Sequence, residues 1–264
     1  MPGETLRLPT AITTTDLLKF AGLAFVFADH TGLFFAPDED WWRVFGRAAA
    51  PIFFFLIGFA RTSSVPFTWL VLGAALTALD AYVSDGLDDV TLNILFNFAL
   101  IRFVMPKVET HVLTRRAGAP ALALFCAAMI PLAAVVLEYG AEGWLWALFG
   151  LVTREAIVKA DPQSRLQRNL VGVFCVAIYL LVETRDFEFE PVQTATLCAL
   201  IITLGLVLAL FRRADAPFQA PAPVARALRW MGRRSLEIYA VSLFIMQLAG
   251  HLLDVDVDAD DNAA

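Results

Sequence analysis

The chain has 264 residues, of which 59% are hydrophobic and 17% are charged, and its formal net charge is -6. Its mean hydropathy is +0.67. Soluble domains are about 45–50% apolar and about 25% charged, so this composition excludes an ordinary water-soluble globule. The charged residues are grouped between apolar runs and give no indication of nucleic-acid binding, so we expect no DNA or RNA partner.

Two local features limit the other possibilities. Cys126, Cys175 and Cys198 lie inside apolar runs without the paired spacing of a metal site or a disulfide framework, and we expect no metal. The first twenty residues carry Glu4 and Asp16 in place of the basic segment that opens a secretory signal. We therefore expect the first apolar run to be retained.

Nine apolar runs follow one another along the chain. A helix rises about 1.5 Å per residue and the hydrocarbon core is about 30 Å thick, so a spanning helix needs roughly 17 to 25 residues. The runs are continuously apolar, which favours helices over a barrel. We predict an all-α, polytopic integral membrane bundle, a single domain over residues 1–264, with spans at 13–36, 42–61, 67–84, 90–106, 118–138, 143–158, 166–183, 191–211 and 226–252.

The connecting loops alternate in the sign of their charge. The loops after the first, third, fifth and seventh runs are acidic, whereas the loops after the even-numbered runs are rich in lysine and arginine. Because cytoplasmic loops carry the excess of basic residues, this alternation predicts a cytoplasmic N-terminus and an external C-terminus. An odd number of spans requires the same arrangement. We expect a multi-pass protein of a bacterial inner membrane.

Several ionisable and amide residues interrupt the first four runs. Such residues cost roughly 2.5 to 3.5 kcal/mol each in hydrocarbon and usually face a cavity or a partner. Counting about 1.5 Å per residue from the outer end of each run places His30 about 9 Å deep, Arg47 about 8 Å, Asp80 about 6 Å and Asn97 about 10 Å. Because consecutive runs joined by short loops tend to be neighbours, the sequence predicts one polar chamber in the outer half of the membrane.

Lys19 and His30 are eleven positions apart. This spacing is about three helical turns and places both on one helix face, about 16 Å apart. Such a face can connect a donor that enters from the cytoplasm with an acceptor that approaches from the outer half.

Structural roles are open for the same residues. Asp29 and Arg47 can form a buried ion pair that only fixes helix packing. His30 can be a hydrogen-bonded core residue. Asn93 and Asn97, four positions apart, can equally serve as interhelical hydrogen-bonding groups.

Three segments resemble a known group of membrane enzymes. TTDLLKFAGLAFVFADHTG and WWRVFGRAAAPIFFFLIGFARTSS resemble the opening of the acyltransferase-3-like transmembrane acyltransferases, and more closely the TraX family of pilin acetylases. WMGRRSLEIYAVSLF resembles the last helices of both groups, although Ala240, Val241 and Ser242 follow Tyr239 where those groups have a histidine. The matching positions are Asp16, Lys19, Asp29, His30, Gly46, Arg47, Pro51 and Phe53.

The resemblance implies transfer of an acyl group, usually acetyl, from cytoplasmic acetyl-CoA as co-substrate. The acceptor would be an amine or hydroxyl at the membrane: a pilin N-terminus, a glycan or a lipid. His30 would act as the general base, with Asp29 or Asp80 orienting its ring, and Arg47 would stabilise the oxyanion. At the inner surface, the phosphates of coenzyme A would bind Lys19, Arg61 and Arg102.

Two other functions are considered. A non-catalytic membrane subunit or assembly factor of a larger complex would keep the fold without the chemistry, and the absent late histidine favours it. A transporter or channel is disfavoured because paired broken half-helices are not seen in the sequence. The expected partners are the lipid bilayer, the acceptor and other proteins of a membrane complex.

Overall fold

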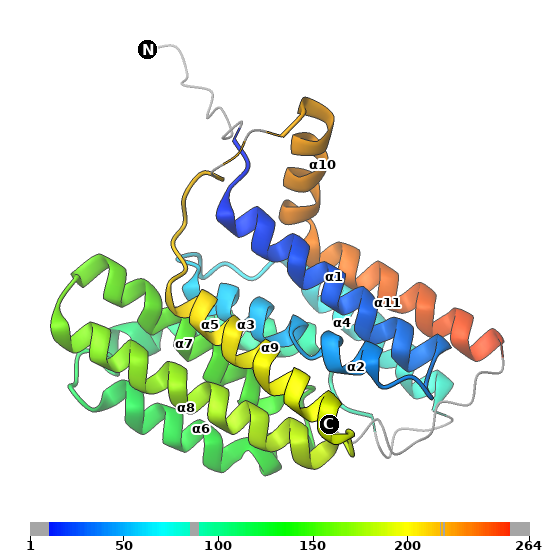
Figure 1. Ribbon diagram of the computed structural model, residues 1–264, viewed down its shortest axis with the longest axis horizontal. Helices are drawn as coiled ribbons and strands as arrows, with labels where there is room; N and C mark the ends of the chain where they lie inside the picture. The colour runs from blue at the N-terminus through cyan, green and yellow to red at the C-terminus, as the bar shows by residue number, and fades with distance from the viewer. Residues whose placement is uncertain (1–10, 85–89, 217, 219, 254–264) are drawn as a thin grey trace.

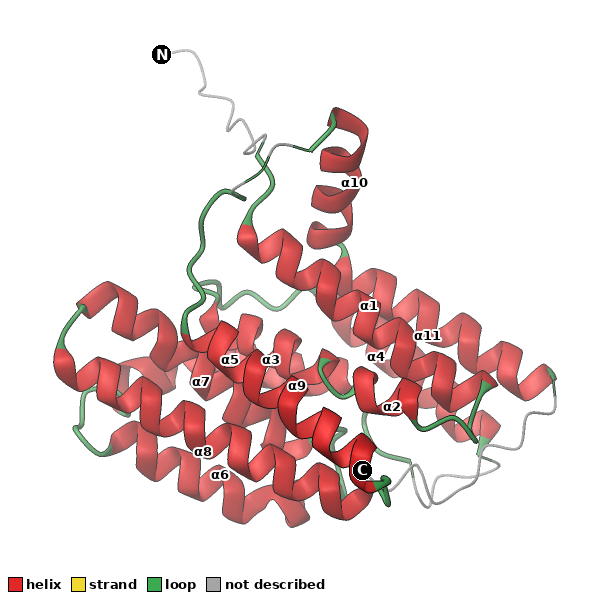
Figure 2. Ribbon diagram, in the orientation of Figure 1, coloured by secondary structure: helices red, strands yellow, loops and turns green. Residues whose placement is uncertain are grey.

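The computed structural model describes residues 11–84, 90–216, 218 and 220–253, and within them every regular element is a helix (Figures 1 and 2). Two isolated bridges, Thr13 with Asp215 and Leu92 with Leu137, are the β-type pairings there. The helices are α1 (Thr14–Phe35), α2 (Trp41–Gly46), α3 (Ala49–Phe59), α4 (Phe67–Val83), α5 (Ile94–His111), α6 (Gly118–Ala134), α7 (Gly140–Lys159), α8 (Pro162–Asp186), α9 (Pro191–Ala209), α10 (Ala222–Arg233) and α11 (Ser235–Leu252).

Five helical stretches are long and apolar enough to cross a membrane. They are α1, the combined stretch Trp41–Phe59, α8, α9 and α11, and α4 and α6 are shorter apolar helices. Large apolar side chains on the outer helices face away from the bundle, such as Val173, which is 72% exposed, and Leu206, which is 63% exposed. An exposed apolar surface of this kind fits contact with lipid. The prediction of an all-helical fold with several helices able to cross a membrane is therefore confirmed.

Two of the predicted spans differ from the structure. The run 42–61 is divided into α2 and α3 around Arg47 and Ala48, and the run 226–252 is divided into α10 and α11 at Arg234. Arginine side chains are costly in hydrocarbon, which fits the separation of the arginine-bearing α10 from the apolar α11. The apolar helix therefore begins at Ser235, and 226 was wrong as the start of the last span.

The centre of the molecule is the contact between α3 and α7. Helix α3 is hydrophobic on all sides and is buried almost completely, as expected for a helix surrounded by others. Phe54, Phe55, Trp146 and Phe149 are fully buried here. Gly58 permits the close approach, because a Cβ atom at this position would overlap the carbonyl oxygen of Ala147.

Helix α1 holds the two sides of the molecule together. It contacts α2 and α3 on one side and α10 and α11 on the other, and α4 packs against α11 (Figure 1). Its start is fixed by a capping box in which Thr13 and Asp16 satisfy each other's backbone N–H groups. Lys19, Asp29 and His30, the candidate site residues on α1, therefore lie between the α3–α7 core and the α4–α11 pair.

Candidate functional site

A basic cavity of about 810 Å³ opens at the end of the molecule where α1 begins. The three residues predicted to bind coenzyme A, Lys19, Arg61 and Arg102, all line it. One acidic side chain, Glu237, is also part of the lining. The basic residues of the lining, drawn from α1, α5, α7, α10 and two loops, are Lys19, Arg61, Arg102, Arg154, Arg212, Arg213 and Arg233.

Several of these basic side chains are held in place by neighbouring groups. Lys19 Nζ donates a hydrogen bond of 2.8 Å to the carbonyl oxygen of Gly232, in the last turn of α10. The Arg102 guanidinium lies 4.9 Å from the centre of the Trp69 ring and donates to the carbonyl oxygen of Thr62 at 3.2 Å. Arg154 donates to the carbonyl oxygen of Ala60 at 2.7 Å. The cavity therefore presents positive charge on positioned side chains.

His30 lies deeper along α1 and is 8% exposed. Its ring centre is 5.8 Å from that of Tyr239 on α11 and 6.1 Å from that of Phe34. The Nδ1 atom is buried without a hydrogen-bond partner in the described part of the chain. His30 is therefore not a satisfied core histidine, and one of its ring nitrogens is unused.

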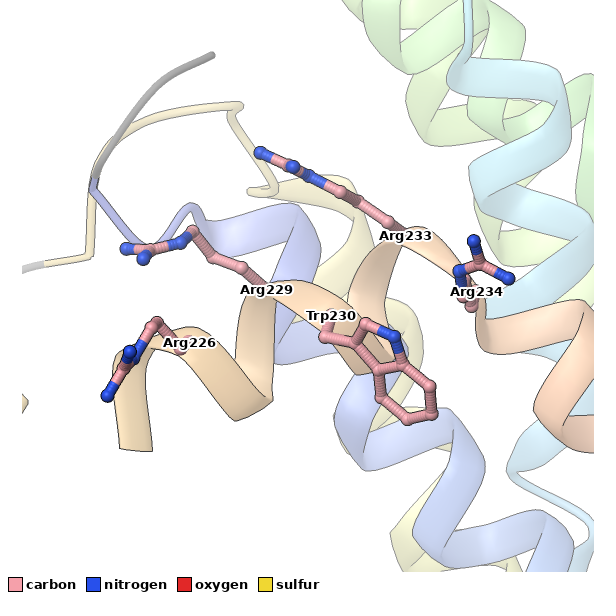
Figure 3. A pocket seen from close by; sticks show the side chains of 5 residues that line it. All are labelled: Arg226, Arg229, Trp230, Arg233 and Arg234. Atoms are coloured by element: carbon pink, nitrogen blue, oxygen red, sulfur yellow. The ribbon is translucent and has the colours of Figure 1, made fainter. Parts of the chain in front are cut away.

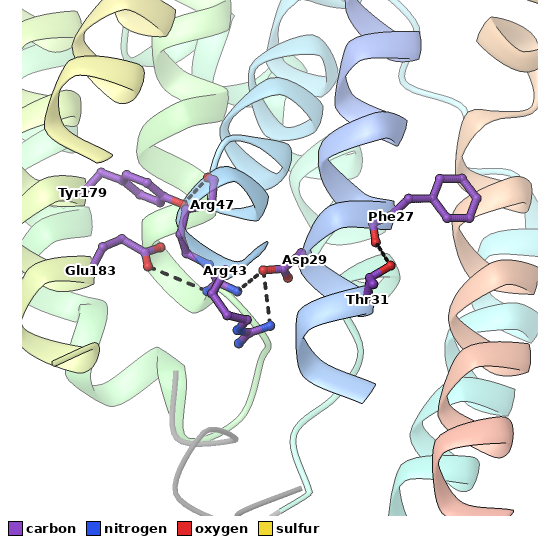
Figure 4. A network of polar contacts seen from close by, with 7 residues as sticks. All are labelled: Phe27, Asp29, Thr31, Arg43, Arg47, Tyr179 and Glu183. Atoms are coloured by element: carbon purple, nitrogen blue, oxygen red, sulfur yellow. Dashed lines mark hydrogen bonds and ion pairs between the residues drawn. The ribbon is translucent and has the colours of Figure 1, made fainter. Parts of the chain in front are cut away.

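Asp29 points to the other side of α1, toward α2 and α8 (Figure 4). Its Oδ1 atom lies 2.7 Å from Arg47 Nη2 and 3.2 Å from Arg43 Nη1, and Arg47 Nη1 lies 3.7 Å from Glu183 Oε2. Both guanidinium groups also face the ring of Phe187. The Asp29–Arg47 pairing is thus the buried ion pair that the sequence allowed.

The glycine before Arg47 has a steric reason. A Cβ atom at Gly46 would overlap Asp29, both its side chain and its backbone. Only glycine lets α2 approach α1 closely enough for Arg47 to reach the carboxylate. Gly46 thus allows the close helix contact that the Arg47–Asp29 ion pair requires.

Asp80 is placed elsewhere, at the contact of α4 with α11. It accepts a hydrogen bond of 3.0 Å from Gln247 Nε2. Among the described residues, no hydrogen bond or ion pair joins His30 to Asp29, Arg47 or Asp80. The structure brings Asp29 and Arg47 together but leaves His30 and Asp80 outside that cluster.

A second polar cluster, made of Tyr239, Asn93 and Glu138, lies beside His30. The sequence did not identify Tyr239 or Glu138 as site residues. Asn93 Nδ2 lies 3.4 Å from the hydroxyl oxygen of Tyr239 and donates to Glu138 Oε2 at 3.2 Å. The backbone N–H of Ile94 donates to the same carboxylate oxygen at 2.8 Å. Burial raises the pKa of Glu138, in the segment between α6 and α7, to about 7. Tyr239, Asn93 and Glu138 thus form a hydrogen-bonded chain next to the imidazole.

Asn97 takes the structural role that the sequence left open. Its Nδ2 atom donates to the carbonyl oxygens of Glu138 at 3.1 Å and Gly140 at 2.9 Å. Its Oδ1 atom accepts a hydrogen bond from Trp144 Nε1 at 3.1 Å. All its bonds join α5 to α7 and the segment before it.

The described residues contain no group of three His, Cys, Asp or Glu side chains arranged to hold a metal ion.

The fold and the two polar regions define a class: helical membrane proteins with a basic cavity at one end and a buried histidine on the same helix as a cavity lysine. The family model described as "TraX protein" matches residues 14–249, so the chain belongs to the TraX family. It is also similar to Protein TraX of Escherichia coli, with 27% identity over 199 residues that cover 73% of this chain and 74% of the relative. No solved structure matches significantly.

Proposed function

We propose that this protein transfers an acetyl group from cytoplasmic acetyl-CoA to an amine or hydroxyl at the membrane. The observation that carries the proposal is the basic cavity, whose lining includes Lys19, Arg61 and Arg102. Coenzyme A carries a diphosphate and a further phosphate on its ribose, and arginine suits such groups because its guanidinium binds two phosphate oxygens at once. A cavity with seven basic residues and one acidic residue, Glu237, suits this donor.

The route we propose from the cavity to His30 follows α1 and α11, beyond the residues that line the cavity itself. Lys19 lines the cavity, and His30 is about 16 Å further along the same face of α1. On α11, Leu236 lines the cavity, and Tyr239, one turn later, packs on the His30 ring. The extended pantetheine arm of a bound donor, following these two helices, would bring the thioester toward His30.

In the proposed reaction, the acceptor nitrogen or oxygen attacks the carbonyl carbon of the thioester. The new C–N or C–O bond forms, the C–S bond breaks, and the proton lost by the acceptor ends on the sulfur of coenzyme A. His30 would carry this proton, because one ring nitrogen is available without breaking an existing hydrogen bond. In this scheme Arg47, although it lies in the Asp29 cluster and not beside the imidazole, would donate to the oxyanion through its buried Nε atom, which lacks a partner in the described residues.

The two aspartates have positioning roles in this scheme. Asp29 holds Arg47 and Arg43 rather than the imidazole. Asp80, through Gln247, fixes α11, the helix that presents Tyr239 to His30.

We further propose nine membrane spans with a cytoplasmic N-terminus in a bacterial inner membrane. Helices α2 and α3 together count as one span, and α10 is not part of a span. This topology puts the basic cavity on the cytoplasmic side, where acetyl-CoA is available. The acceptor would be a pilin N-terminus, a glycan or a lipid at the membrane.

The test is transfer of labelled acetyl from acetyl-CoA by the purified full-length protein in lipid nanodiscs, with membrane extract as the source of acceptor. His30→Ala is expected to lower the rate by about 10²- to 10⁴-fold, the usual contribution of a general base. His111→Ala, at the exposed end of α5, is the matched control and should transfer normally. Equal transfer by both variants would remove His30 from the mechanism.

One observation favours a second function. The Asp29 carboxylate pairs with two arginines, and no carboxylate in the described residues forms a hydrogen bond or ion pair with His30. A non-catalytic membrane subunit that keeps the fold for assembly would show such a cluster as a purely structural element. This function predicts that the wild-type protein neither transfers acetyl nor binds coenzyme A.

A further inference from the structure

Helix α10 differs from every other helix in the way its residues are distributed. Arg226, Arg229 and Arg233 are spaced by three and four positions, which places them on one face of the helix. Val224, Ala227 and Met231 have the same spacing and lie on the opposite face. Such a division into a basic and an apolar face is typical of helices that lie at a membrane surface.

The apolar face of α10 is uncovered at Val224 and Ala227, whereas Met231, in the last turn, packs against the hydrophobic core. Gly232 is the only buried residue of α10. Val224 is 46% exposed, and Trp230, beside the arginines, is 57% exposed. The opposite face forms an open surface pocket of about 400 Å³ between Arg226, Arg229, Trp230, Arg233 and Arg234 (Figure 3).

The position of α10 in the fold also suits a helix at a membrane surface. The helix turns away from α11 at Arg234 and stands across the end of α1 instead of continuing along the bundle (Figure 1). It is docked there through Gly232, which lies against Asp16 and whose carbonyl oxygen accepts a hydrogen bond from Lys19. In the proposed topology, a helix across this end of the bundle would lie close to the plane of the membrane surface.

We propose that α10 is an interfacial helix that binds the anionic surface of the bilayer. Val224 and Ala227 enter the boundary between headgroups and acyl chains, and Arg226 and Arg229 bind lipid phosphates. Trp230 lies at headgroup level, where amphipathic rings are favoured. Each arginine near an anionic surface strengthens binding roughly fivefold. This binding is independent of acyl transfer.

Hydrogen–deuterium exchange on the full-length protein tests the proposal. The protein is placed in nanodiscs of phosphatidylcholine alone or of a mixture rich in phosphatidylglycerol. We expect exchange of the backbone amides of 222–233 to be at least about tenfold slower in the anionic nanodiscs, because several arginines act together. The difference should disappear in Arg226→Gln/Arg229→Gln and persist in Arg165→Gln/Arg168→Gln, which removes two charges at the start of α8.

A second measurement gives the depth of the helix. A nitroxide on Ala227→Cys, in a Cys198→Ser background, should collide more with oxygen than with a water-soluble nickel complex. A label that is more accessible to the nickel complex would overturn the proposal, as would equal exchange in both lipids. Protection of 222–233 by added coenzyme A but not by anionic lipid would also overturn it and assign the arginines to the donor.

Discussion

Arg47 Nη2 lies 2.7 Å from Asp29 Oδ1, and both side chains are buried between α1, α2 and α8. The pair joins the last third of α1 to the break between α2 and α3. Removing one member of such a pair leaves an uncompensated charge, which is far more costly than removing both. The Asp29–Arg47 pair thus fixes the position of α2 against α1.

Asp29→Asn is therefore expected to destabilise the protein strongly. It leaves Arg43 and Arg47 without their shared carboxylate, and breaking a buried pair typically costs about 3–5 kcal/mol. Thermal unfolding in detergent measures the change. Asp38→Asn, at an exposed loop position, is the control. Equal melting temperatures for the two variants would contradict the structural role of Asp29.

Gly46→Ala tests the close approach of α2 to α1. The added methyl group overlaps Asp29, so the helices must move apart, at a cost of about 1–3 kcal/mol for an overpacked site. At Gly250 the nearest atom to an added Cβ is 3.2 Å away, and Gly250→Ala should cost clearly less. The melting temperatures of the two variants measure the loss of stability at each position. A smaller loss at Gly46 than at Gly250 would show that the contact is not tight.

Glu138 makes stability depend on pH. Its pKa is raised by burial to about 7 from an ordinary value of 4.5. Between these values the folded protein binds more protons than the unfolded chain, so the free energy of unfolding falls as the pH rises from about 4.5 to about 7. Glu138→Gln keeps the acceptor for the Ile94 N–H and should flatten this slope.

Melting temperature against pH checks this effect. Glu188→Gln, which changes an exposed carboxyl group on the loop after α8, should retain the wild-type slope. The role assigned to Glu138 is wrong if its variant loses stability with pH as the wild type does.

Arg102→Gln tests the donor cavity by kinetics. The Arg102 guanidinium is held against Trp69 and Thr62, and losing a hydrogen bond to a phosphate costs about 1.5–3 kcal/mol. We expect the KM for acetyl-CoA to rise by roughly tenfold or more with little change in kcat. Arg116→Gln, an exposed arginine before α6, is the control. A fall in kcat at unchanged KM would place Arg102 outside the donor site.

The sequence predicted the helical membrane class because long apolar runs leave few alternatives. The resemblance to transmembrane acyltransferases implied that Lys19, Arg61 and Arg102 lie together at the inner surface. All three line the same cavity. The number of spans and the orientation stay predictions.

The breaks inside two predicted spans could not be found by hydropathy. The average over 226–252 is dominated by the apolar residues of α11, so the arginines of α10 looked like the end of a span. The amphipathic spacing of Arg226, Arg229 and Arg233 was a signal that could have separated the two helices. At Arg47 the signal was Pro51, which has no N–H to bond the carbonyl oxygen of Arg47 in a continuous helix; that oxygen accepts a hydrogen bond from the Tyr179 hydroxyl instead.

The cluster beside His30 was hidden for a different reason. Tyr239, Asn93 and Glu138 come from three distant parts of the chain, and only the packing of α11 against α1 and α4 brings them together. Counting along the sequence placed Asp80 near the C-terminal end of its helix, as α4 has it, but could not give the direction of the side chain. Its partner is Gln247 on α11 rather than His30.

Binding of coenzyme A, measured by titration calorimetry on the full-length protein in nanodiscs, is the most direct test of the proposed donor site. We predict that the wild type binds coenzyme A and that Lys19→Gln/Arg61→Gln/Arg102→Gln weakens binding by at least about a hundredfold, because each lost charged hydrogen bond contributes about 1.5–3 kcal/mol. Arg115→Gln/Arg116→Gln/Arg165→Gln, which removes three basic residues outside the cavity lining, should bind like the wild type. No binding by the wild type, or equal affinity in the cavity variant, would contradict acetyl-CoA as the ligand of this cavity.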